Sequence, residues 1–294
     1  MQPVFAHVNS VVMCIGDDCN NDGIDRRSFL VGASAALTGF SVLQGRKAYA
    51  QTKQPETRVV DDPKVQHGRV TFKHNGADTI DGYLARPKTE GIYPAVLVIA
   101  GNKISEEYIP NTCAALALAG FVGLAPNIFH PLPDDIPSNN DAYNKYLANH
   151  TELDRLDDVQ AGVSYLRTQP FVSSGGMGVI GFCRGGREAM LFGARCREID
   201  AVVAFHPAPM KEKELTRLKK VPVQIHHGTA DESVAVTETQ KTQKTLKAQG
   251  TPVEVFLYEG ANHGFLAYTR PFYKPDAAKV AWTRATQFLH KYLK

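Results

Sequence analysis

The chain has 294 residues, which is enough for one large domain or two small ones. Its apolar content of 43% is ordinary for a soluble globular protein. The formal net charge of +3 is too small to indicate binding to nucleic acid or to an anionic membrane surface, and no dense run of lysine or arginine changes that conclusion.

The first fifty residues resemble an export signal. Residues 25–30, DRRSFL, resemble the twin-arginine motif, residues 28–44 are uncharged, and residues 48–50, AYA, form a small-x-small cleavage site. The apolar part is too short and too rich in Gly, Ser and Thr to favour a membrane anchor. We therefore predict a leader over residues 1–50, export by the twin-arginine pathway to the bacterial periplasm, and no membrane attachment after cleavage. A buried N-terminal helix is the alternative interpretation.

Strand patterns begin after a polar stretch. Residues 51–66 are polar and contain two prolines, so we interpret them as a linker. Residues 69–73 and 79–86 alternate between apolar and polar side chains around the turn sequence NGAD, which predicts a hairpin. From residue 94 onward the pattern changes: residues 95–100 form a continuous apolar run, which is typical of a strand covered on both faces. Further strands are predicted at residues 121–125, 177–180, 200–205, 221–226 and 253–258.

Helical patterns alternate with these strands. They occupy residues 109–118, 156–166, 187–194, 234–248 and 281–292. The alternation predicts an α/β fold, in which helices flank a doubly wound, mostly parallel sheet. Residues 126–152 are polar, proline-rich and contain several aromatics, and a segment of that length between core elements is expected to cap a binding site.

The cysteines do not form a disulfide framework. Cys14 and Cys19 fall within the predicted leader, and the three others are Cys113, Cys183 and Cys196, an odd number. Cys113 and Cys196 lie in apolar, helix-like contexts, so we interpret them as packing residues.

Residues 181–186, GFCRGG, have the pattern of a nucleophile elbow. They join a predicted strand to a predicted helix, and the flanking glycines leave room for the tight, strained turn that such an elbow needs. Cys183 occupies the nucleophile position, where serine is more usual. The start of a helix favours a thiolate, so this position can activate a cysteine.

Two more polar residues follow predicted strands, at the edge of the sheet where ligands bind. Asp231 comes after the strand at 221–226, and His263 comes after the strand at 253–258. With Cys183 they give the order nucleophile, acid, histidine of the α/β-hydrolases. In that arrangement His263 exchanges a proton with the thiol, and Asp231 orients the imidazole. Taken singly, Asp231 also fits a helix cap, and His263 also fits an ordinary loop.

An acyl-transfer step of this kind needs two backbone donors for the oxyanion. We expect one from the N–H of Arg184, directly after the nucleophile. The other is expected from the loop after residues 95–100, at Asn102.

These motifs resemble those of the dienelactone hydrolase family, which carries G-x-C-x-G-G at its elbow and a Cys-Asp-His triad. The resemblance extends over residues 68–293 and implies an α/β-hydrolase domain over residues 67–294. It also implies hydrolysis of a carboxylic ester or lactone through an acyl-cysteine, without a metal or a cofactor. Further similar segments are residues 117–121, 124–127, 263–265 and 269–271.

Two positions depart from the family pattern. The first active-site loop of the family carries a glutamate where this chain has Gly101, with Glu106 and Glu107 a few residues further on. An arginine that binds the substrate carboxylate in the family is replaced by Ala267. These differences imply an ester or lactone other than a dienelactone. The candidate substrate contacts are Gly101, Lys103, Phe129, His206, Arg187, Phe265 and Arg270.

No metal site is predicted, because His130, His206 and the pair at 226–227 show no spacing typical of metal ligands. Two other functions stay open. The same fold and triad serve acyl hydrolases that act on peptides or thioesters, and the missing glutamate is compatible with a binding protein of little catalytic activity. We expect a monomer or a small homo-oligomer whose partner is a small-molecule ester or lactone.

Overall fold

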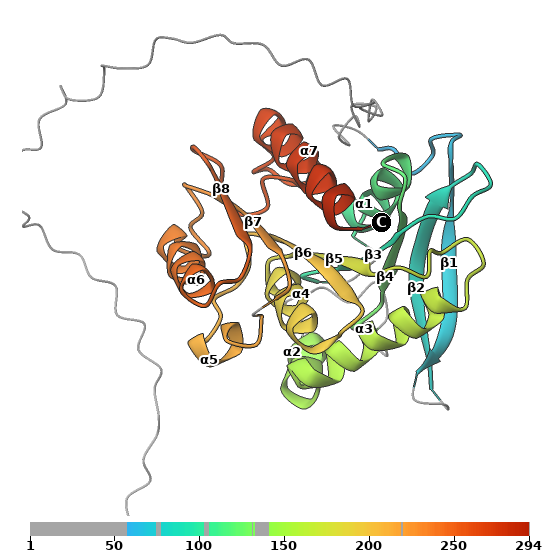
Figure 1. Ribbon diagram of the computed structural model, residues 1–294, viewed down its shortest axis with the longest axis horizontal. Coiled ribbons are helices and arrows are strands. Elements are labelled where there is room, and N and C mark those ends of the chain that lie inside the picture. The colour runs from blue at the N-terminus through green and yellow to red at the C-terminus, as the bar shows by residue number, and fades with distance from the viewer. Residues whose placement is uncertain are drawn as a thin grey trace, which may run out of the picture. The chain divides into compact units, whose positions relative to one another are not determined.

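The computed structural model describes residues 58–74, 78–102, 106–130, 132, 141–218 and 220–293, and the predicted leader lies outside these ranges. The described chain forms an eight-stranded sheet with helices on both faces (Figure 1). Within these ranges, no helix combines the length and the apolarity that crossing a bilayer requires.

The sheet is mostly parallel, as predicted. Strand β2 runs antiparallel to both of its neighbours, and the other neighbouring strands run parallel. The pairing of β1 with β2 confirms the predicted hairpin, whose turn at residues 75–77 lies outside the described residues. In spatial order the strands are β1 (Val65–His74), β2 (Asp78–Pro87), β4 (Val122–Pro126), β3 (Ala95–Ile99), β5 (Met177–Phe182), β6 (Ile199–Phe205), β7 (Val223–Gly228) and β8 (Val253–Tyr258).

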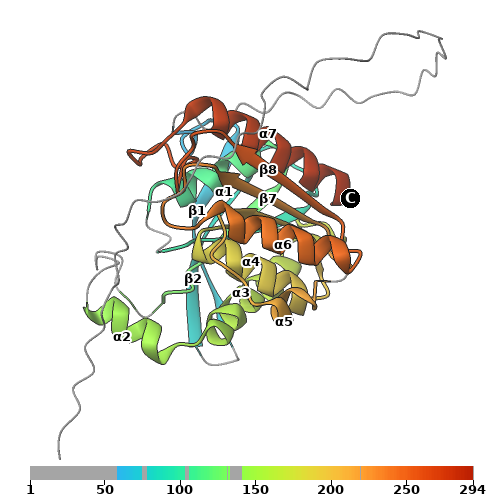
Figure 2. The ribbon, with the colours of Figure 1, turned by 90° about the vertical axis from the view of Figure 1, so that its left-hand side faces the viewer.

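Two layers of helices cover the sheet, as Figures 1 and 2 show. Alternate residues of a strand point to opposite faces, so Val96 and Val98 pack in one layer whereas Leu97 and Ile99 pack in the other. The first layer contains α1 (Tyr108–Leu118) and α7 (Pro275–Tyr292), and the second contains α2 (Asp141–Asn149), α3 (Glu152–Arg167), α4 (Arg184–Arg195), α5 (Glu212–Leu215) and α6 (Val236–Ala248).

Helix α2 lies within the segment that the sequence predicts as a cap over a site, and its helical character is not predicted. Of its residues, Tyr143 and Tyr146 are buried, and both rings pack against Phe129. Packing therefore defines this helix more than its sequence periodicity does. Helix α3 follows at once and begins with a capping box between Thr151 and Asp154.

The parallel strands end at one edge of the sheet. The loops after β3, β5, β6, β7 and β8 carry polar or small residues at this edge. In that order these residues are Gly101, Cys183, His206, Asp231 and His263. Because ligands bind at the carboxyl ends of the strands in sheets of this kind, the edge is the place to look for a site.

Backbone segments approach one another closely at the turn between β5 and α4. A Cβ atom on Gly181 would lie 2.0 Å from the carbonyl oxygen of Gly185, and one on Gly185 would lie 2.2 Å from the carbonyl oxygen of Ile99. Both distances are shorter than any real Cβ contact. The start of α4 is therefore held directly against β3 and β5, with no side chain between them.

We expect Gly185→Ala to lower the free energy of unfolding by about 1–3 kcal/mol, because the added methyl group overpacks this contact. Urea unfolding at neutral pH measures the change. Gly68→Ala is the matched control, since a Cβ atom at Gly68 meets nothing within 4 Å, and its effect is expected to stay within about 1 kcal/mol. Equal stability of the two variants would contradict the close approach.

Candidate active site

Cys183 occupies the turn between β5 and α4 in a strained backbone conformation. Its φ is 55° and its ψ is −118°, in the left-handed half of the map that non-glycine residues avoid. Backbone hydrogen bonds hold it there: its N–H donates to Phe205 (3.0 Å), and its carbonyl accepts from Gly186 (3.0 Å) and Ala208 (3.1 Å). The half-buried thiol is thus fixed at the first turn of α4.

Asp231 and His263 form a hydrogen-bonded pair at the same edge. His263 Nδ1 lies 2.9 Å from Asp231 Oδ2, and the Asp231 side chain is fully buried. The other carboxylate oxygen accepts from the backbone N–H groups of Ser233 (2.9 Å) and Val234 (2.8 Å). Asp231 therefore both caps the following turn and holds the ring of His263. The two interpretations of Asp231, as a helix cap and as the partner of His263, are thus compatible.

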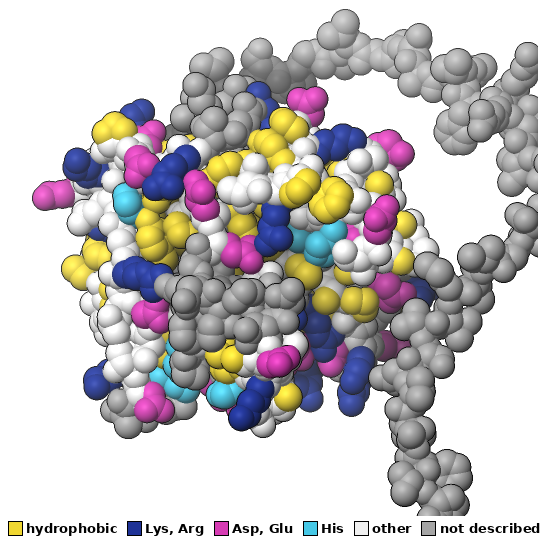
Figure 3. All heavy atoms as spheres, turned by 180° about the vertical axis from the view of Figure 1, so that it is seen from behind, with side chains coloured by type: hydrophobic (Ala, Val, Ile, Leu, Met, Phe, Trp, Pro, Cys, Tyr) yellow, Lys and Arg dark blue, Asp and Glu magenta, His cyan; other side chains and the backbone are white. Residues whose placement is uncertain are grey.

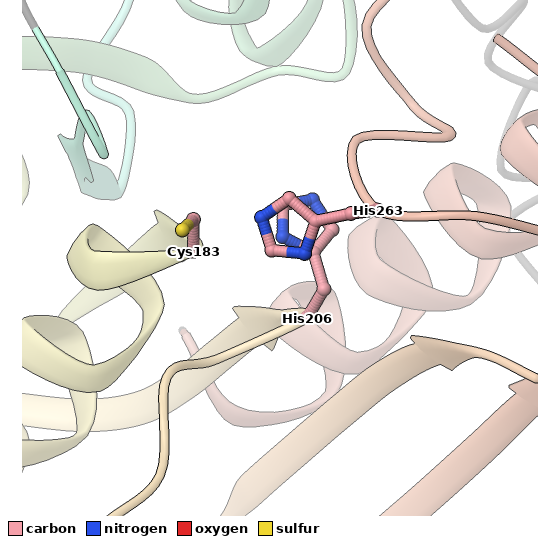
Figure 4. A group of neighbouring side chains, drawn as sticks. All are labelled: Cys183, His206 and His263. Atoms are coloured by element: carbon pink, nitrogen blue, oxygen red, sulfur yellow. The ribbon is translucent and has the colours of Figure 1, made fainter. Parts of the chain in front are cut away.

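The thiol of Cys183 and the imidazoles of His206 and His263 gather in one group. One polar atom from each of them lies within 4.8 Å of the others. In Figure 4 the two rings overlap and lie on the same side of Cys183. The ring centroids of His206 and His263 are 4.2 Å apart, with 55° between the ring planes. Three loops that are distant in sequence therefore bring a sulfur and two imidazoles together.

The charge states of Cys183 and His263 depend on each other. Burial lowers the pKa of His263, but the hydrogen bonds and charges of Asp231 and Cys183 outweigh burial and raise it to about 9. Burial raises the pKa of the Cys183 thiol, but His263 and the backbone N–H of Arg184 outweigh it, so that pKa falls below the usual thiol range. Each group therefore stabilises the charged form of the other.

The surroundings favour a charged Asp231 and a neutral His206. Burial raises the pKa of Asp231, but the hydrogen bonds from His263 and from the N–H of Val234 lower it below the usual carboxyl range. Burial, with the charge of His263, lowers the pKa of His206 to about 3, so this imidazole is neutral. Among the described residues, the buried Nδ1 of His206 has no hydrogen-bond partner.

A cavity of about 350 Å³ opens above the thiol. This volume is within the range of small-molecule sites. Five predicted contacts or donors line it: Gly101, Asn102, Arg184, His206 and Arg270. The lining also includes Ala267, the position of the family arginine, and Tyr108, Leu266, Pro271 and Phe272, which were not predicted as contacts.

A chain of hydrogen bonds runs across the rim of the cavity. Arg184 Nη1 donates to the hydroxyl of Tyr143 (2.9 Å), which donates to Asn102 Oδ1 (3.1 Å). Asn102 Nδ2 donates to Glu106 Oε1 (3.1 Å), and Arg270 Nη2 donates to Glu106 Oε2 (2.6 Å). Both arginines of the cavity are therefore engaged by other side chains. Acidic and basic side chains are likewise interspersed over the face in Figure 3.

Two aromatic residues predicted as substrate contacts are packed in the core instead. Phe129 is fully buried against Tyr143 and Tyr146. Phe265 is also fully buried, and its ring lies 6.4 Å from that of His206 and 5.1 Å from that of Tyr258. Phe265 thus contacts the ring of His206 edge-on, and Phe129 packs against the ring of Tyr143.

The predicted cations do not share one location. Arg187 bonds Glu152 (2.8 Å) and Glu214 (3.0 Å) and donates to the Pro209 carbonyl (2.6 Å), so it ties α3, α4 and α5 together away from the cavity lining. Lys103 lies outside the described residues. Arg270 is the predicted cation that reaches the cavity beside Arg184.

The structure gives a reason for Gly101. A Cβ atom there would lie 2.7 Å from the carbonyl oxygen of Phe182 and 3.3 Å from Cys183 Cβ, so a glutamate needs a displaced backbone. Glu106 is bound to Asn102 and Arg270, and Glu107 accepts from the Tyr268 hydroxyl (2.8 Å). In these hydrogen bonds neither Glu106 nor Glu107 contacts the thiol of Cys183, as the family glutamate would.

The cavity-lining residues that were not predicted have only weak patterns in the sequence. Tyr108 begins α1 and lies edge-on against Phe182, with ring centroids 5.6 Å apart. Leu266 and Phe272 belong to the loop after His263, whose length predicts a site wall but not which side chains face inward. Tyr143 lies in the aromatic-rich segment predicted to cap the site, and that aromatic content was its signal.

Both the sequence of this chain and its fold are similar to those of known proteins. The model of the dienelactone hydrolase family matches residues 80–293. A solved structure from Klebsiella pneumoniae, described as a "Putative Dienelactone Hydrolase", has the same fold, with a TM-score of 0.70 and 24% identity; the match covers 78% of this chain and 99% of that one. The α/β-hydrolase fold expected from the sequence is thereby confirmed.

Curated relatives cover nearly the same region. A protein of Aquifex aeolicus named "Putative carboxymethylenebutenolidase" is 33% identical over 76% of this chain and 98% of its own length. A Bradyrhizobium protein named "Probable 2-oxo-3-(5-oxofuran-2-ylidene)propanoate lactonase" is 32% identical over 72% of this chain and 89% of its own length. On the family match and these identities, the chain belongs to the dienelactone hydrolase family.

Proposed function

We propose that this member of a hydrolase family cleaves uncharged carboxylic esters or lactones, with Cys183 as nucleophile, His263 as proton-transfer group and Asp231 as its orienting acid. One observation carries the proposal: the thiol of Cys183 lies beneath a cavity and next to the imidazole of His263. The Nδ1 atom of that imidazole is 2.9 Å from the buried carboxylate of Asp231. The printed names of the two relatives, a butenolidase and a lactonase, support cleavage of an ester or lactone, although both names denote lactones that carry a carboxylate. The preference for an uncharged substrate rests on the rim charges of this chain.

In the first step the Cys183 thiolate attacks the carbonyl carbon and forms a tetrahedral intermediate. The intermediate collapses to an acyl-cysteine as the C–O bond breaks, and the His263 imidazolium gives its proton to the leaving alkoxide. For a lactone the leaving hydroxyl stays attached to the acyl group. The raised pKa of His263 supports this role, because it keeps the proton available until the leaving group needs it.

In the second step a water molecule attacks the acyl-cysteine. His263, now neutral, accepts the proton of that water, and the thiolate leaves as the acid product forms. The hydrogen bond from His263 Nδ1 to Asp231 directs Nε2 of the ring toward the reacting groups and stabilises the imidazolium. Asp231 keeps its charge throughout, as its lowered pKa supports.

The negative charge on the carbonyl oxygen needs donors that are already in place. We assign one donor to the backbone N–H of Arg184, which is at the first turn of α4 and already acts on the sulfur. We assign the other to the backbone N–H of Asn102, which lines the cavity next to Gly101. The positive end of α4 adds to the stabilisation of the oxyanion.

The charges at the rim favour a substrate without a free carboxylate. The guanidinium of Arg270 is paired with Glu106 at 2.6 Å, and Arg184 donates to Tyr143. An anionic substrate would have to displace Glu106 or remain next to its carboxylate. Ala267, at the position of the carboxylate-binding arginine in the family, also lines the cavity and offers only a methyl group.

Variants of the pair test the chemistry. We expect Cys183→Ala and His263→Ala each to lower kcat/KM for a small chromogenic ester at least about 10³-fold, because the residues act as a unit. Cys183→Ser is expected to keep low but measurable activity. Cys196→Ala, which removes a buried thiol at the far end of α4, is the control and should hydrolyse the ester at the wild-type rate. Undiminished hydrolysis by Cys183→Ala would reject the mechanism.

Alkylation by iodoacetamide tests the ionisation of Cys183. Because His263 lowers the pKa of this thiol, we expect half-maximal alkylation at a pH below that of a free cysteine, and a shift to higher pH in His263→Gln. Mass spectrometry of the digested protein gives the rate at each cysteine. Cys113 and Cys196 serve as internal controls, since burial raises the pKa of both thiols. An unchanged profile in His263→Gln would contradict the coupling.

Paired substrates test the role of the rim. The measurement is the ratio of kcat/KM for an ester that carries a free carboxylate to kcat/KM for its uncharged amide analogue. We expect Glu106→Gln to raise this ratio about 5–10-fold, because it releases the Arg270 guanidinium, and Arg270→Gln to leave it low. A ratio that does not change in Glu106→Gln would show that the ion pair does not set the preference.

A further inference from the structure

A second group of polar side chains lies at the same edge of the sheet, outside the cavity. His74 is the last residue of β1, and His130 follows β4 by four residues. Strands β1 and β4 run in the same direction, because both are antiparallel to β2, so their carboxyl ends share one edge. Asp158 lies on α3, which packs against both strands. The fold thus brings two imidazoles and a carboxylate together from three elements.

The spacing of these side chains is wider than that of hydrogen bonds. Asp158 Oδ1 lies 3.7 Å from His74 Nδ1, and Asp158 Oδ2 lies 3.5 Å from His130 Nδ1. One ligand atom from each residue lies within 4.8 Å of the others. In a tetrahedral site with metal–ligand bonds of about 2.0–2.2 Å, neighbouring ligand atoms are about 3.3–3.6 Å apart. The two distances to Asp158, each to a different carboxylate oxygen, are close to that range, whereas the 4.8 Å bound on single ligand atoms means that the three side chains would draw together around an ion.

Burial makes this arrangement costly without a cation. The Asp158 side chain is 4% exposed, and a buried carboxylate needs a compensating charge or hydrogen bonds. His130 Nδ1 is buried and, among the described residues, has no hydrogen-bond partner. A divalent cation between the three groups would satisfy the nitrogen and the carboxylate together.

We propose that His74, His130 and Asp158 form a binding site for a divalent transition metal, for which Zn²⁺ is the best match. Imidazole nitrogen with one carboxylate oxygen suits Zn²⁺, whereas Mg²⁺ and Ca²⁺ prefer oxygen ligands alone. The His74 and His130 side chains are 15% and 24% exposed, so the proposed site borders solvent, which would supply a water molecule as a fourth ligand. A bound ion would join β1, the loop after β4 and α3.

The group of side chains around Cys183 could also bind Zn²⁺, so the experiment has to remove it. Cys183, His206 and His263 also offer a thiolate and two imidazoles within 4.8 Å of one another, and thiolates bind Zn²⁺ strongly. The titration therefore uses the metal-free Cys183→Ser protein. We expect calorimetry to find one equivalent of Zn²⁺ per chain in this protein, with affinity at least about tenfold lower in Asp158→Asn and in His130→Gln made in the same background.

The control is His67→Gln, which removes another histidine of β1, one that bonds the Tyr83 hydroxyl, and leaves the proposed ligands in place. It should bind Zn²⁺ like the Cys183→Ser parent. Thermal unfolding gives a second measurement: Zn²⁺ should raise the melting temperature of the parent but not of Asp158→Asn or His130→Gln, whose metal-free transitions show that they are folded. Loss of all Zn²⁺ binding in Cys183→Ser, or equal binding by parent and both ligand variants, would overturn the proposal.

Discussion

The close approach of three backbone segments at the elbow is the constraint on which the rest of the site depends. Gly181 and Gly185 let α4 start in direct contact with β5 and with the carbonyl of Ile99 on β3. That contact leaves Cys183 with a φ of 55°, a conformation that an isolated chain would seldom adopt. The strain is offset by packing elsewhere, and it keeps the sulfur at one fixed point above the sheet.

The electrostatics follow from that fixed point. Desolvation by itself would keep the thiol of Cys183 protonated and the imidazole of His263 neutral. A fully buried carboxylate next to His263 reverses the outcome for the imidazole, and the imidazolium reverses it for the thiol. Asp231 can stay charged in this place because Ser233 and Val234 donate backbone N–H groups to its second oxygen. The turn after β7 thus acts on the Cys183 thiol through His263, whose pKa Asp231 helps to raise.

The sequence predicts the parts of the structure that local pattern determines. The mostly parallel sheet, the first hairpin and the positions of Cys183, Asp231 and His263 at the ends of strands follow from apolar runs and turn residues. Whether a loop side chain faces the cavity depends on tertiary packing instead. Phe129 and Phe265 are apolar enough to line the cavity or to pack in the core. Their contacts with Tyr143 and Tyr258 place them in the core. The bond from Arg270 to Glu106 spans 164 residues and leaves no local pattern.

The departure at Gly101 changes how the thiol must be activated. Where a carboxylate lies beside a thiol, it favours the protonated sulfur, because two negative charges repel each other. In this chain a side chain at residue 101 would collide with the backbone of Phe182, and the nearby Glu106 is neutralised by Arg270. The sulfur therefore faces His263 and the first N–H of α4 without an opposing carboxylate at that position. The glycine therefore leaves His263 and the N–H of Arg184 as the groups that lower the pKa of the Cys183 thiol, with no side chain at residue 101 to oppose them.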